Sequence, residues 1–461
     1  VNSSGLVETV ELLGSEDVRD GNFPTPNTEW GTAAGWTIAD NKATSAGANE
    51  DAYLTQSNMV LGKTYKVTFD VDDYTSGALS VRVFGQSQVL AVTSTGSYIV
   101  YLTPVSTTVL GFRSAGGAGG YVGSVSNISV KESTKNNLAR VDYDGTASSL
   151  LVEPERTNTL LYSEDFSQYL AGGTAPTLTT GQLAPDGTYN ATKVSGVIGS
   201  TNLYRNSESS TTASRSIYAR TVSGTGTAKL TSHNSNTNNL FTLTEDWQRF
   251  ELTGSSAIGG TNFYAADFRD TSQTLSEFII WGCQSEEGSY PTSYIPTDGG
   301  TVTRVQDQYS KTGISNLINS EEGVLFVEMA ALDSSGTYRL ISLSDGTDNN
   351  RLFIGLDTAT GYIYYYVIVG GVVKANFTTS IFPSAFTKVA VKYKENDFAL
   401  WINGVEVSTD SGGTTFPIGT LDRLKFESGN AGTVPFYGKV KQLQVFKTAL
   451  TDSELIALTT I

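Results

Sequence analysis

Short segments that alternate apolar and polar residues recur along most of the chain, and they restrict the fold more than any other feature. Tyr65–Val71 reads YKVTFDV, Leu79–Phe84 reads LSVRVF and Thr387–Tyr393 reads TKVAVKY. Such alternation places the apolar side chains on one face of a strand and is typical of a sheet that buries that face. Clusters of Gly, Asn and Ser separate the segments at the spacing of a β-sandwich. The sequence therefore predicts an all-β protein.

Composition agrees with many short strands joined by turns. The chain of 461 residues contains 47 Gly and 11 Pro, and only 16% of its residues are charged. A single hydrophobic core does not grow to this length, so we expect three or four domains. Because 39% of the residues are hydrophobic, each domain can bury a core of its own.

Charge and rare residue types exclude several classes of function. The formal net charge of −16 argues against nucleic acid and anionic membranes as partners. No apolar run reaches the roughly 18 residues of a spanning helix, so we expect no membrane insertion. One histidine, His233, leaves no basis for serine, cysteine or metal catalysis built around histidine. The one cysteine, Cys283, lies in the apolar run FIIWGC and is predicted to be a buried, inert thiol.

Changes in this pattern along the chain predict six parts. Residues 1–14 give a strand of one module, 15–133 an inserted β-sandwich, 134–153 the return of that module, 154–300 a second sandwich, 301–319 a linker, and 320–461 a third β domain. Strands are expected at Tyr65–Val71, Leu79–Phe84, Tyr98–Leu102, Thr108–Phe112 and Val122–Lys131; at Ala213–Arg220, Ala228–His233, Leu240–Leu243, Trp247–Leu252, Asn262–Phe268 and Glu277–Gln284; and at Gly323–Met329, Tyr338–Ser344, Arg351–Leu356, Tyr362–Val369, Val372–Phe377, Thr387–Tyr393, Asp397–Ile402 and Gly438–Phe446.

The two sandwiches contain matching segments in the same order. YKVTFDV at 65–71 parallels RSIYART at 215–221, and YIVYLTP at 98–104 parallels WQRFELT at 247–253. GYVGSVSNISVKE at 120–132 likewise parallels SEFIIWGCQSEEG at 276–288. This order predicts tandem copies of one sandwich type.

The junction between the two sandwiches carries a specific family resemblance. LLVEPERTNTLLYSEDF at Leu150–Phe166 and GCQSEEGSYPTSYIPTDGGTVTR at Gly282–Arg304 resemble a module of tailed-bacteriophage structural proteins, including tail fibres, head fibres and minor virion proteins. The resemblance implies a protein of the virion surface whose partners are other capsid or tail proteins. Within the first run, Pro154 disfavours the helical region for Glu153, so an extended segment and a bend are expected.

The resemblance also predicts an insertion. In such proteins a run like VNSSGLVETV at 1–10 comes shortly before one like RVDYDG at 140–145, whereas residues 11–139 separate the two runs here. We therefore expect the first sandwich to project sideways from the module that it interrupts. In that case Val7–Leu13 packs near Val141–Val152.

Two further resemblances concern the sandwich domains. DGNFPTPNTEWGTAAGWTIADNKATSAG at 20–47 resembles the start of carbohydrate-binding modules of the jelly-roll type. FALWINGVEV at 398–407 and FYGKVKQLQVFKTALTDSELIAL at 436–458 resemble the laminin-G-like or concanavalin A-like jelly roll. That family implies a short helix after the last strand, and Thr451 with Glu454 fits a capped start. The expected architecture is tandem jelly-roll β-sandwiches, the last concanavalin A-like, with one short C-terminal helix.

Sugar binding needs flat aromatic faces together with amide and carboxylate groups. In the first sandwich Trp30, Trp36 and Tyr74 are candidates, the alternative being that Trp36 packs in the core and Trp30 plugs one end of the sandwich. In the second sandwich Tyr204 and Tyr264 are surface candidates, each beside polar and charged residues.

The run YIYYYVIV supplies the candidates of the third domain. By the period of a strand, Tyr362, Tyr364 and Tyr366 share one face and Tyr365 takes the other. This face is predicted either to bind a ligand, with Tyr364 as a contact, or to pack in a core or subunit interface.

Calcium is the metal to consider, because only oxygen ligands are abundant. Asp345, Asp348 and Asn349 cluster in one loop, for which an ordinary Asx turn is the alternative. No other cofactor is expected. The carboxylate pairs of the chain are adjacent in sequence and point to opposite faces of a strand, so we predict no catalytic residues and no enzyme.

Together these features predict an adhesive fibre or decoration protein on the virion surface. It would bind host or environmental polysaccharide through shallow aromatic sites, and many copies would supply avidity. The avidity argument and the family resemblance favour a homo-oligomer, in particular a trimer. Two alternatives stay open, namely a decoration protein that binds no glycan and a polysaccharide-degrading enzyme or its accessory module.

Overall fold

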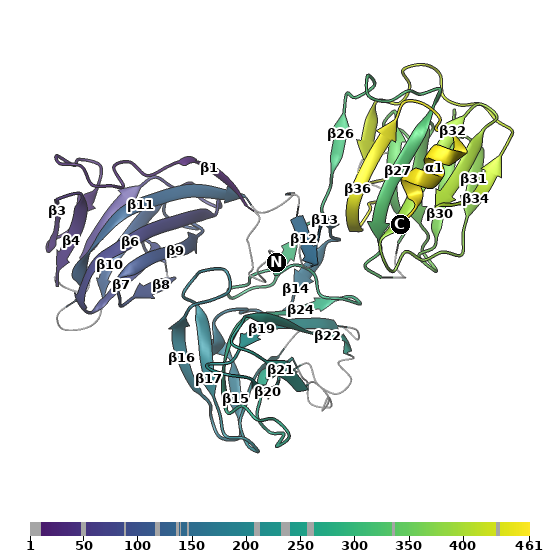
Figure 1. Ribbon diagram of the computed structural model, residues 1–461. Helices are drawn as coiled ribbons and strands as arrows, with labels where there is room; N and C mark the ends of the chain where they lie inside the picture. The colour runs from purple at the N-terminus through teal and green to yellow at the C-terminus, as the bar shows by residue number, and fades with distance from the viewer. Residues whose placement is uncertain are drawn as a thin grey trace.

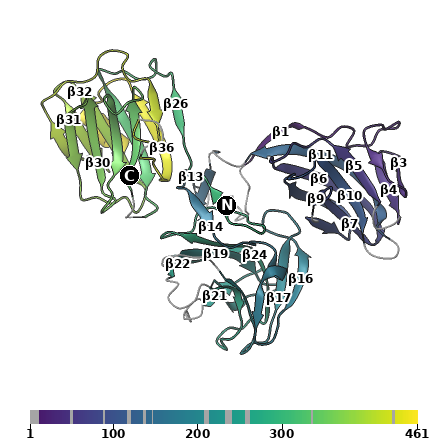
Figure 2. The same cartoon turned by 180° about the vertical axis from the view of Figure 1, so that it is seen from behind.

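The computed structural model of the chain describes residues 11–47, 52–86, 89–115, 120–134, 138, 140–144, 147–206, 213–231, 240–255, 262–333, 337–429 and 434–461. These residues form three β lobes around central strands β12 (Arg140–Asp144), β13 (Ala147–Val152) and β14 (Arg156–Asn158), as Figure 1 shows. The view from behind in Figure 2 separates the same three lobes. Strands provide nearly all of the regular structure, so the all-β prediction is confirmed. In the part of the chain that is described, no helix is long and apolar enough to cross a membrane.

The first lobe is a sandwich of two antiparallel sheets. On β6 the residues Tyr65, Val67, Phe69 and Val71 are buried while the intervening side chains are half-buried, as their alternation predicts. One sheet has the order β3-β4-β11-β6-β9 with β1 on β11, and the other β2-β5-β10-β7-β8. The strands are β1 (Leu12–Glu16), β2 (Gly31–Thr32), β3 (Trp36–Ala39), β4 (Lys42–Ala46), β5 (Tyr53–Ser57), β6 (Tyr65–Ser76), β7 (Ala78–Val83), β8 (Leu90–Val92), β9 (Gly96–Leu102), β10 (Val109–Ala115) and β11 (Val122–Thr134).

The second lobe has a main sheet of order β16-β17-β24-β19-β22, a sheet β15-β18-β23 and a pair β20-β21. Its strands are β15 (Leu170–Gly172), β16 (Thr177–Gln182), β17 (Ala191–Ser195), β18 (Asn202–Asn206), β19 (Ala213–Arg220), β20 (Gly226–Lys229), β21 (Leu240–Leu243), β22 (Gln248–Ser255), β23 (Asn262–Asp267) and β24 (Glu277–Glu287), and a 3-10 turn spans Phe166–Gln168. Cys283 is fully buried, and burial raises the pKa of its thiol far above the ordinary value, as expected for an inert residue. The predicted strand end at His233 lies outside the described residues.

Strand order confirms that the two lobes repeat one sandwich type. The matching segments lie on β6 and β19, on β9 and β22, and on β11 and β24. In the first lobe these strands run β11-β6-β9, and in the second they run β24-β19-β22, at the same places in sheets of the same order. The sequence parallels therefore correspond to equivalent strands.

The third lobe packs a seven-stranded sheet, β12-β13-β36-β27-β32-β33-β34, against a six-stranded sheet, β26-β35-β28-β29-β30-β31. Its remaining strands are β26 (Ser310–Thr312), β27 (Glu322–Ala330), β28 (Arg339–Ser344), β29 (Arg351–Leu356), β30 (Ile363–Val369), β31 (Val372–Thr378), β32 (Thr387–Lys394), β33 (Phe398–Ile402), β34 (Val405–Asp410), β35 (Arg423–Lys425) and β36 (Gly438–Phe446).

Two local predictions in this lobe are confirmed. Asn403 and Gly404 form the two-residue loop between β33 and β34, with φ of 49° and 82°. The helix α1 (Asp452–Thr459) begins with a capping box, in which Thr451 and Glu454 bond each other's backbone N–H. Leu455 of α1 then packs on Phe326 and Trp401, so the helix covers the outer face of the seven-stranded sheet.

The predicted insertion is wrong. Leu12 and Leu13 of β1 pair with Thr134 and Ser133 of β11, within the first lobe and not beside Val141–Val152. The physical reason is an open strand edge. Strand β11 is 13 residues long, and β4 pairs only with its first part, so the end of β11 lacks a neighbour on that side until β1 supplies one. Residues 7–10 of the predicted contact lie outside the described residues.

Two predicted connecting segments belong instead to the third lobe. Within residues 134–153, β13 pairs with β36, and Val152 lies in the core between the two large sheets. Within residues 301–319, β26 pairs with β35, and Ile314 and Ile318 join the same core. These apolar side chains are buried by strands far away in the sequence. The boundary predicted at residue 320 is therefore wrong.

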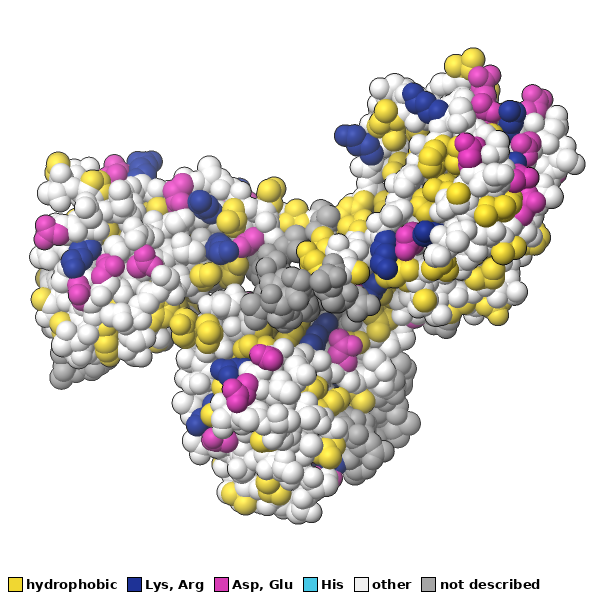
Figure 3. Space-filling view, in the orientation of Figure 1, with side chains coloured by type: hydrophobic (Ala, Val, Ile, Leu, Met, Phe, Trp, Pro, Cys, Tyr) yellow, Lys and Arg dark blue, Asp and Glu magenta, His cyan; other side chains and the backbone are white. Residues whose placement is uncertain are grey.

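The remaining junction strand connects the lobes. Strand β14 lies between the second and third lobes (Figure 1), and it pairs with β25 (Val302–Arg304). Figure 3 shows that charged side chains are scattered over the visible face, most of which is uncharged.

Candidate functional site

One sheet of the third lobe carries an aromatic outer surface. On β30, Tyr365 is fully buried in the core, whereas Tyr364 and Tyr366 point to the opposite face. The predicted alternation of the tyrosines is therefore confirmed. Phe353 stacks on Tyr366 with ring centroids 5.5 Å apart, and Tyr338 lies 5.8 Å from Tyr364. We call these four aromatic residues together with Leu340 the tyrosine face: Tyr338, Leu340, Phe353, Tyr364 and Tyr366.

A glycine allows one of these rings to lie close to the sheet. A Cβ on Gly355 would come within 2.6 Å of the Tyr364 ring and 2.5 Å of Leu340. Tyr364 is consequently only 7% exposed, and burial raises the pKa of its phenol well above the ordinary value. Tyr366 is half-buried and Tyr338 is 48% exposed, so these rings border solvent.

Polar groups without charge lie beside the rings. Asn376 is directly opposite Tyr366 and Thr378 is directly opposite Tyr364, and both are exposed on the same side of the sheet. At one end of the face, Arg351 lies 5.2 Å over the Phe353 ring and pairs with Asp348. The face thus combines aromatic surface with amide and hydroxyl groups, while its one guanidinium has a carboxylate partner.

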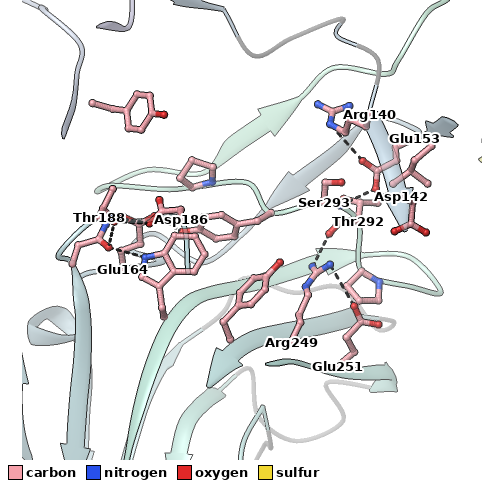
Figure 4. A pocket seen from close by; sticks show the side chains of 18 of the residues that line it. Arg140, Asp142, Glu153, Glu164, Asp186, Thr188, Arg249, Glu251, Thr292 and Ser293 are labelled. Carbon is pink, nitrogen blue, oxygen red and sulfur yellow. Dashed lines mark hydrogen bonds and ion pairs between the residues drawn. The ribbon is translucent and has the colours of Figure 1, made fainter. Parts of the chain in front are cut away.

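A cleft of about 540 Å³ opens where the first and second lobes meet the central strands. In Figure 4, Glu164, Asp186 and Thr188 gather at one end, and Arg140, Glu153 and Ser293 lie at the other. The first lobe contributes Leu90, Ile99 and Tyr101, and Asp142 and Lys439 come from the third-lobe sheet. Its volume lies within the roughly 300–1,000 Å³ that is usual for ligand pockets.

Three aromatic rings on the outer face of the second-lobe sheet form the floor of this cleft. The rings of Trp281 and Tyr294 are 4.5 Å apart, and Tyr218 lies 5.4 Å from Trp281. Trp281 and Tyr218 are buried and Tyr294 is half-buried. Tyr189 is 38% exposed at the rim and meets Tyr98 of the first lobe at 5.3 Å.

A hydrogen-bonded group of polar side chains fixes one end of the floor. The Trp281 indole N–H donates to Asn190 Oδ1 at 2.8 Å, and Asn190 Nδ2 donates to Glu164 at 2.5 Å. The Tyr294 hydroxyl donates to the other oxygen of Glu164 at 2.7 Å. Asp186 Oδ1 accepts from the backbone N–H of Thr188 at 3.0 Å in an Asx turn. This arrangement positions oxygen and amide groups beside the aromatic rings.

Two predicted sugar contacts are core residues instead. Trp30 and Trp36 are only 6% and 4% exposed. The indole N–H of Trp30 donates to the carbonyl oxygens of Arg19 and Asp20, and that of Trp36 donates to Ala52. Both rings are packed among aromatic neighbours and held by the backbone, so the prediction of an exposed tryptophan platform is wrong.

The other predicted contacts are partly or fully covered. Tyr74 is half-buried, and its hydroxyl donates to Gly77 O at 3.0 Å. Tyr204 is half-buried and pairs across β18 and β23 with Tyr264, which is 3% exposed and lies beneath the guanidinium of Arg269. Tyr264 therefore does not present a ring face, while Tyr204 stays a predicted contact.

The proposed calcium loop has the geometry of an Asx turn. Asp345 Oδ1 accepts from the backbone N–H and the hydroxyl of Thr347, and Asn350 donates to Oδ2. Partial burial raises the pKa of Asp345, but these hydrogen bonds outweigh it and hold the pKa below the ordinary value. Among the described residues, no group of three or more His, Cys, Asp or Glu side chains could hold a metal ion. Calcium binding at Asp345, Asp348 and Asn349 stays a prediction.

The cleft residues were not predicted from the sequence. One signal was available, because EFIIWGCQ is apolar at both alternating sets of positions, which indicates a strand covered on both faces. Ile279 and Trp281 occupy the outer face, whereas Phe278 and Ile280 occupy the core. What covers the outer face comes from distant loops, and local patterns do not reveal it.

A family model described as the concanavalin A-like lectin/glucanases superfamily matches residues 324–456. The third lobe is therefore a concanavalin A-like domain, as its C-terminal motifs predicted. No curated protein matches the chain.

Solved structures with similar folds include sugar-binding modules and a laminin fragment. The CBM40 module of the Ruminococcus gnavus IT-sialidase is 20% identical, with 33% of this chain and 99% of that one covered and a TM-score of 0.27. The tandem CBM22 domains of Paenibacillus barcinonensis Xyn10C are 10% identical, with coverage of 61% and 99% and a TM-score of 0.24. Domains LG4-5 of mouse laminin α1 are 11% identical, with coverage of 67% and 92% and a TM-score of 0.22. These similarities carry no conclusion about function.

Proposed function

We propose that the chain is a non-catalytic saccharide-binding protein whose concanavalin A-like domain holds a polysaccharide on the tyrosine face. The observation that carries the proposal is the half-buried ring of Tyr366, which borders solvent, stacks at 5.5 Å on the buried Phe353 and lies beside the exposed Asn376 and Thr378. Ring faces pack against the C–H groups of a pyranose, and amide and hydroxyl groups bond its hydroxyls. The match of this domain to a superfamily that includes lectins supports the proposal.

The tyrosine face is an open sheet surface, so a single contact would be weak. A polysaccharide repeats its sugar units, and several copies of the protein on one particle would bind it together. This reasoning extends the proposal to an adhesive fibre or decoration protein on the surface of a tailed-phage virion, assembled as a homo-oligomer such as a trimer. Its partners would be capsid or tail proteins and host-surface polysaccharide. The support for this part is the resemblance of LLVEPERTNTLLYSEDF at Leu150–Phe166 to phage structural modules.

The test is glycan-array binding by the intact chain and by two tyrosine variants. Tyr366→Ala removes a stacked ring and is expected to lower binding about tenfold or more. Tyr143→Ala is the matched control, because Tyr143 is 39% exposed on β12, away from the face. Equal binding by the intact chain and Tyr366→Ala would contradict the proposed site. Absence of binding to every glycan would instead favour a decoration protein, and shortened polysaccharide products would favour an enzyme.

A further inference from the structure

We infer that the cleft between the first two lobes is a second saccharide site, which takes a segment of uncharged sugar residues. It is lined chiefly by the first two lobes, and its third-lobe residues belong to the seven-stranded sheet and not to the sheet with the tyrosine face, so the inference goes beyond the proposed function. Three independent features of the cleft support it: its aromatic floor, its unsatisfied polar groups and its balance of charges.

The aromatic floor continues to an accessible rim. Trp281, Tyr294 and Tyr218 are in mutual ring contact, and Tyr294 is half-buried above the buried indole of Trp281. Tyr189 extends the aromatic surface to the rim, where it is 38% exposed. Trp281 and Tyr218 are buried and support the floor from below, so the rings on which an extended sugar chain can stack are those of Tyr294 and Tyr189.

Two polar groups lack the partners that a saccharide hydroxyl would provide. Tyr290 lines the cleft, and its hydroxyl group is buried and makes no hydrogen bond to any described residue. Leaving such a group unpaired costs free energy, which a bound hydroxyl would recover. Asp186 uses Oδ1 for the turn to Thr188, and among the described residues no donor is bonded to Oδ2. A carboxylate oxygen accepts well from a pair of vicinal sugar hydroxyls.

The charges of the cleft argue against an acidic sugar. Each of its three cations already has a carboxylate partner. Lys439 Nζ lies 2.5 Å from Asp142, Arg249 lies 3.4 Å from Glu251, and Arg140 pairs with Asp307. An anionic ligand would have to break these pairs and approach Asp186. The carboxylates that line the cleft are Asp142, Glu153, Glu164, Asp186 and Glu251, against Arg140, Arg249 and Lys439.

The site is complete only when the first lobe is docked. Tyr98 packs against Tyr189 across the lobes at 5.3 Å, and Ile99 and Tyr101 form the opposite wall. A ligand in the cleft would contact both lobes, so its binding would strengthen their association. A test of binding in the cleft therefore needs the intact chain.

The experiment titrates neutral hexasaccharides of glucose, mannose and N-acetylglucosamine into a Tyr366→Ala chain, in which the tyrosine face is impaired. Asp186→Asn and Tyr189→Ala are then added separately, with Asp246→Asn as the matched control, because Asp246 is exposed on the same lobe outside the cleft. We expect each cleft variant to weaken the remaining binding about tenfold or more, and the control to leave it unchanged. Hexagalacturonate, the anionic probe, should bind far more weakly than the neutral hexasaccharides.

Three results would overturn the inference. In the first, no neutral hexasaccharide binds the Tyr366→Ala chain. In the second, the cleft variants bind like the control. In the third, hexagalacturonate binds more tightly than the neutral probes and loses affinity in the cleft variants. The proposed function is judged separately, by the difference between the intact chain and Tyr366→Ala.

Discussion

The guanidinium of Arg304 lies 2.9 Å from the carboxylate of Glu153, and both side chains are almost completely buried. Glu153 also accepts from the backbone N–H of Ser293 at 2.8 Å, and its own N–H donates to Asp307 at 2.9 Å. Arg140 of the third-lobe sheet pairs with Asp307. This network joins β12, the end of β13 and β25, so the junction segment is a packed centre for two lobes and not a flexible connection.

Removal of one partner should therefore destabilise the junction strongly. Glu153→Ala leaves the guanidinium of Arg304 buried beside that of Arg140 without its nearest carboxylate, and we expect a loss of about 3–5 kcal/mol in the free energy of unfolding. Urea unfolding followed by intrinsic fluorescence measures it. Glu155→Ala is the control, because Glu155 is two residues away and exposed. A similar midpoint for both variants would mean that the ion pair does not hold the junction.

The assignment of β13 to the third lobe makes a different prediction. Val152 is fully buried in the core of that lobe, so Val152→Ala should lower the free energy of unfolding of the third lobe by about 2 kcal/mol. Hydrogen exchange should quicken in β36 and β27 and stay unchanged in β24. Val197→Ala, at a position 53% exposed in the second lobe, is the control. Faster exchange in β24 alone would place the segment in the second lobe.

The local sequence pattern was sufficient to predict the strands but not the domain boundaries. Tyr65–Val71 alternates strictly, and it is a strand with one face buried against a second sheet. Thr387–Tyr393 is also a strand, but both of its faces are buried, one against the second sheet and one against α1. β13 reads ASSLLV, which does not alternate, and its partner β36 lies almost 300 residues further along the chain, between Gly438 and Phe446. Pairing over such a separation is fixed by the tertiary fold, which no local window contains.

The two candidate sites differ in how far the sequence alone could predict them. The period of β30 was enough to place Tyr364 and Tyr366 on one outer face, because that face depends on a single strand. The cleft depends on loops and strands of all three lobes, so its members had no shared pattern. Trp30 and Trp36 appeared to be surface candidates because they lie in a loop-like stretch, but the loop folds inward over the core.

Acidification should weaken the contacts that hold Glu11 and β1 against the first lobe. Glu11 accepts from Lys66 and Ser133 of the first lobe, each at 2.6 Å. Partial burial raises the pKa of Glu11, but these hydrogen bonds outweigh it, and the pKa lies below its ordinary value. A carboxylate whose pKa is lower in the folded state stabilises that state above its ordinary pKa of about 4.3, and the contribution disappears as pH falls through the lowered pKa.

We therefore expect hydrogen exchange at β1 to quicken below about pH 4 in the intact chain, after correction for the intrinsic pH dependence of exchange. Glu11→Gln should show faster exchange already at neutral pH and little further change on acidification. Glu155→Gln, outside the first lobe, serves as the control. A pH response of β1 that persists in Glu11→Gln would assign the effect to another group.

The close approach at Gly355 offers a way to test the tyrosine face without removing a ring. In Gly355→Ala the new Cβ would lie 2.6 Å from the Tyr364 ring and 2.5 Å from Leu340, so both side chains must shift. We expect a loss of about 1–3 kcal/mol in the free energy of unfolding, together with weaker polysaccharide binding because the ring is lifted out of the row. Gly300→Ala is the matched control, since nothing lies within 4 Å of its new Cβ. Urea unfolding measures the stability, and affinity electrophoresis in polysaccharide gels measures the binding. If Gly355→Ala is destabilised but is retarded by the polysaccharide as much as the intact chain, Tyr364 does not contact the ligand.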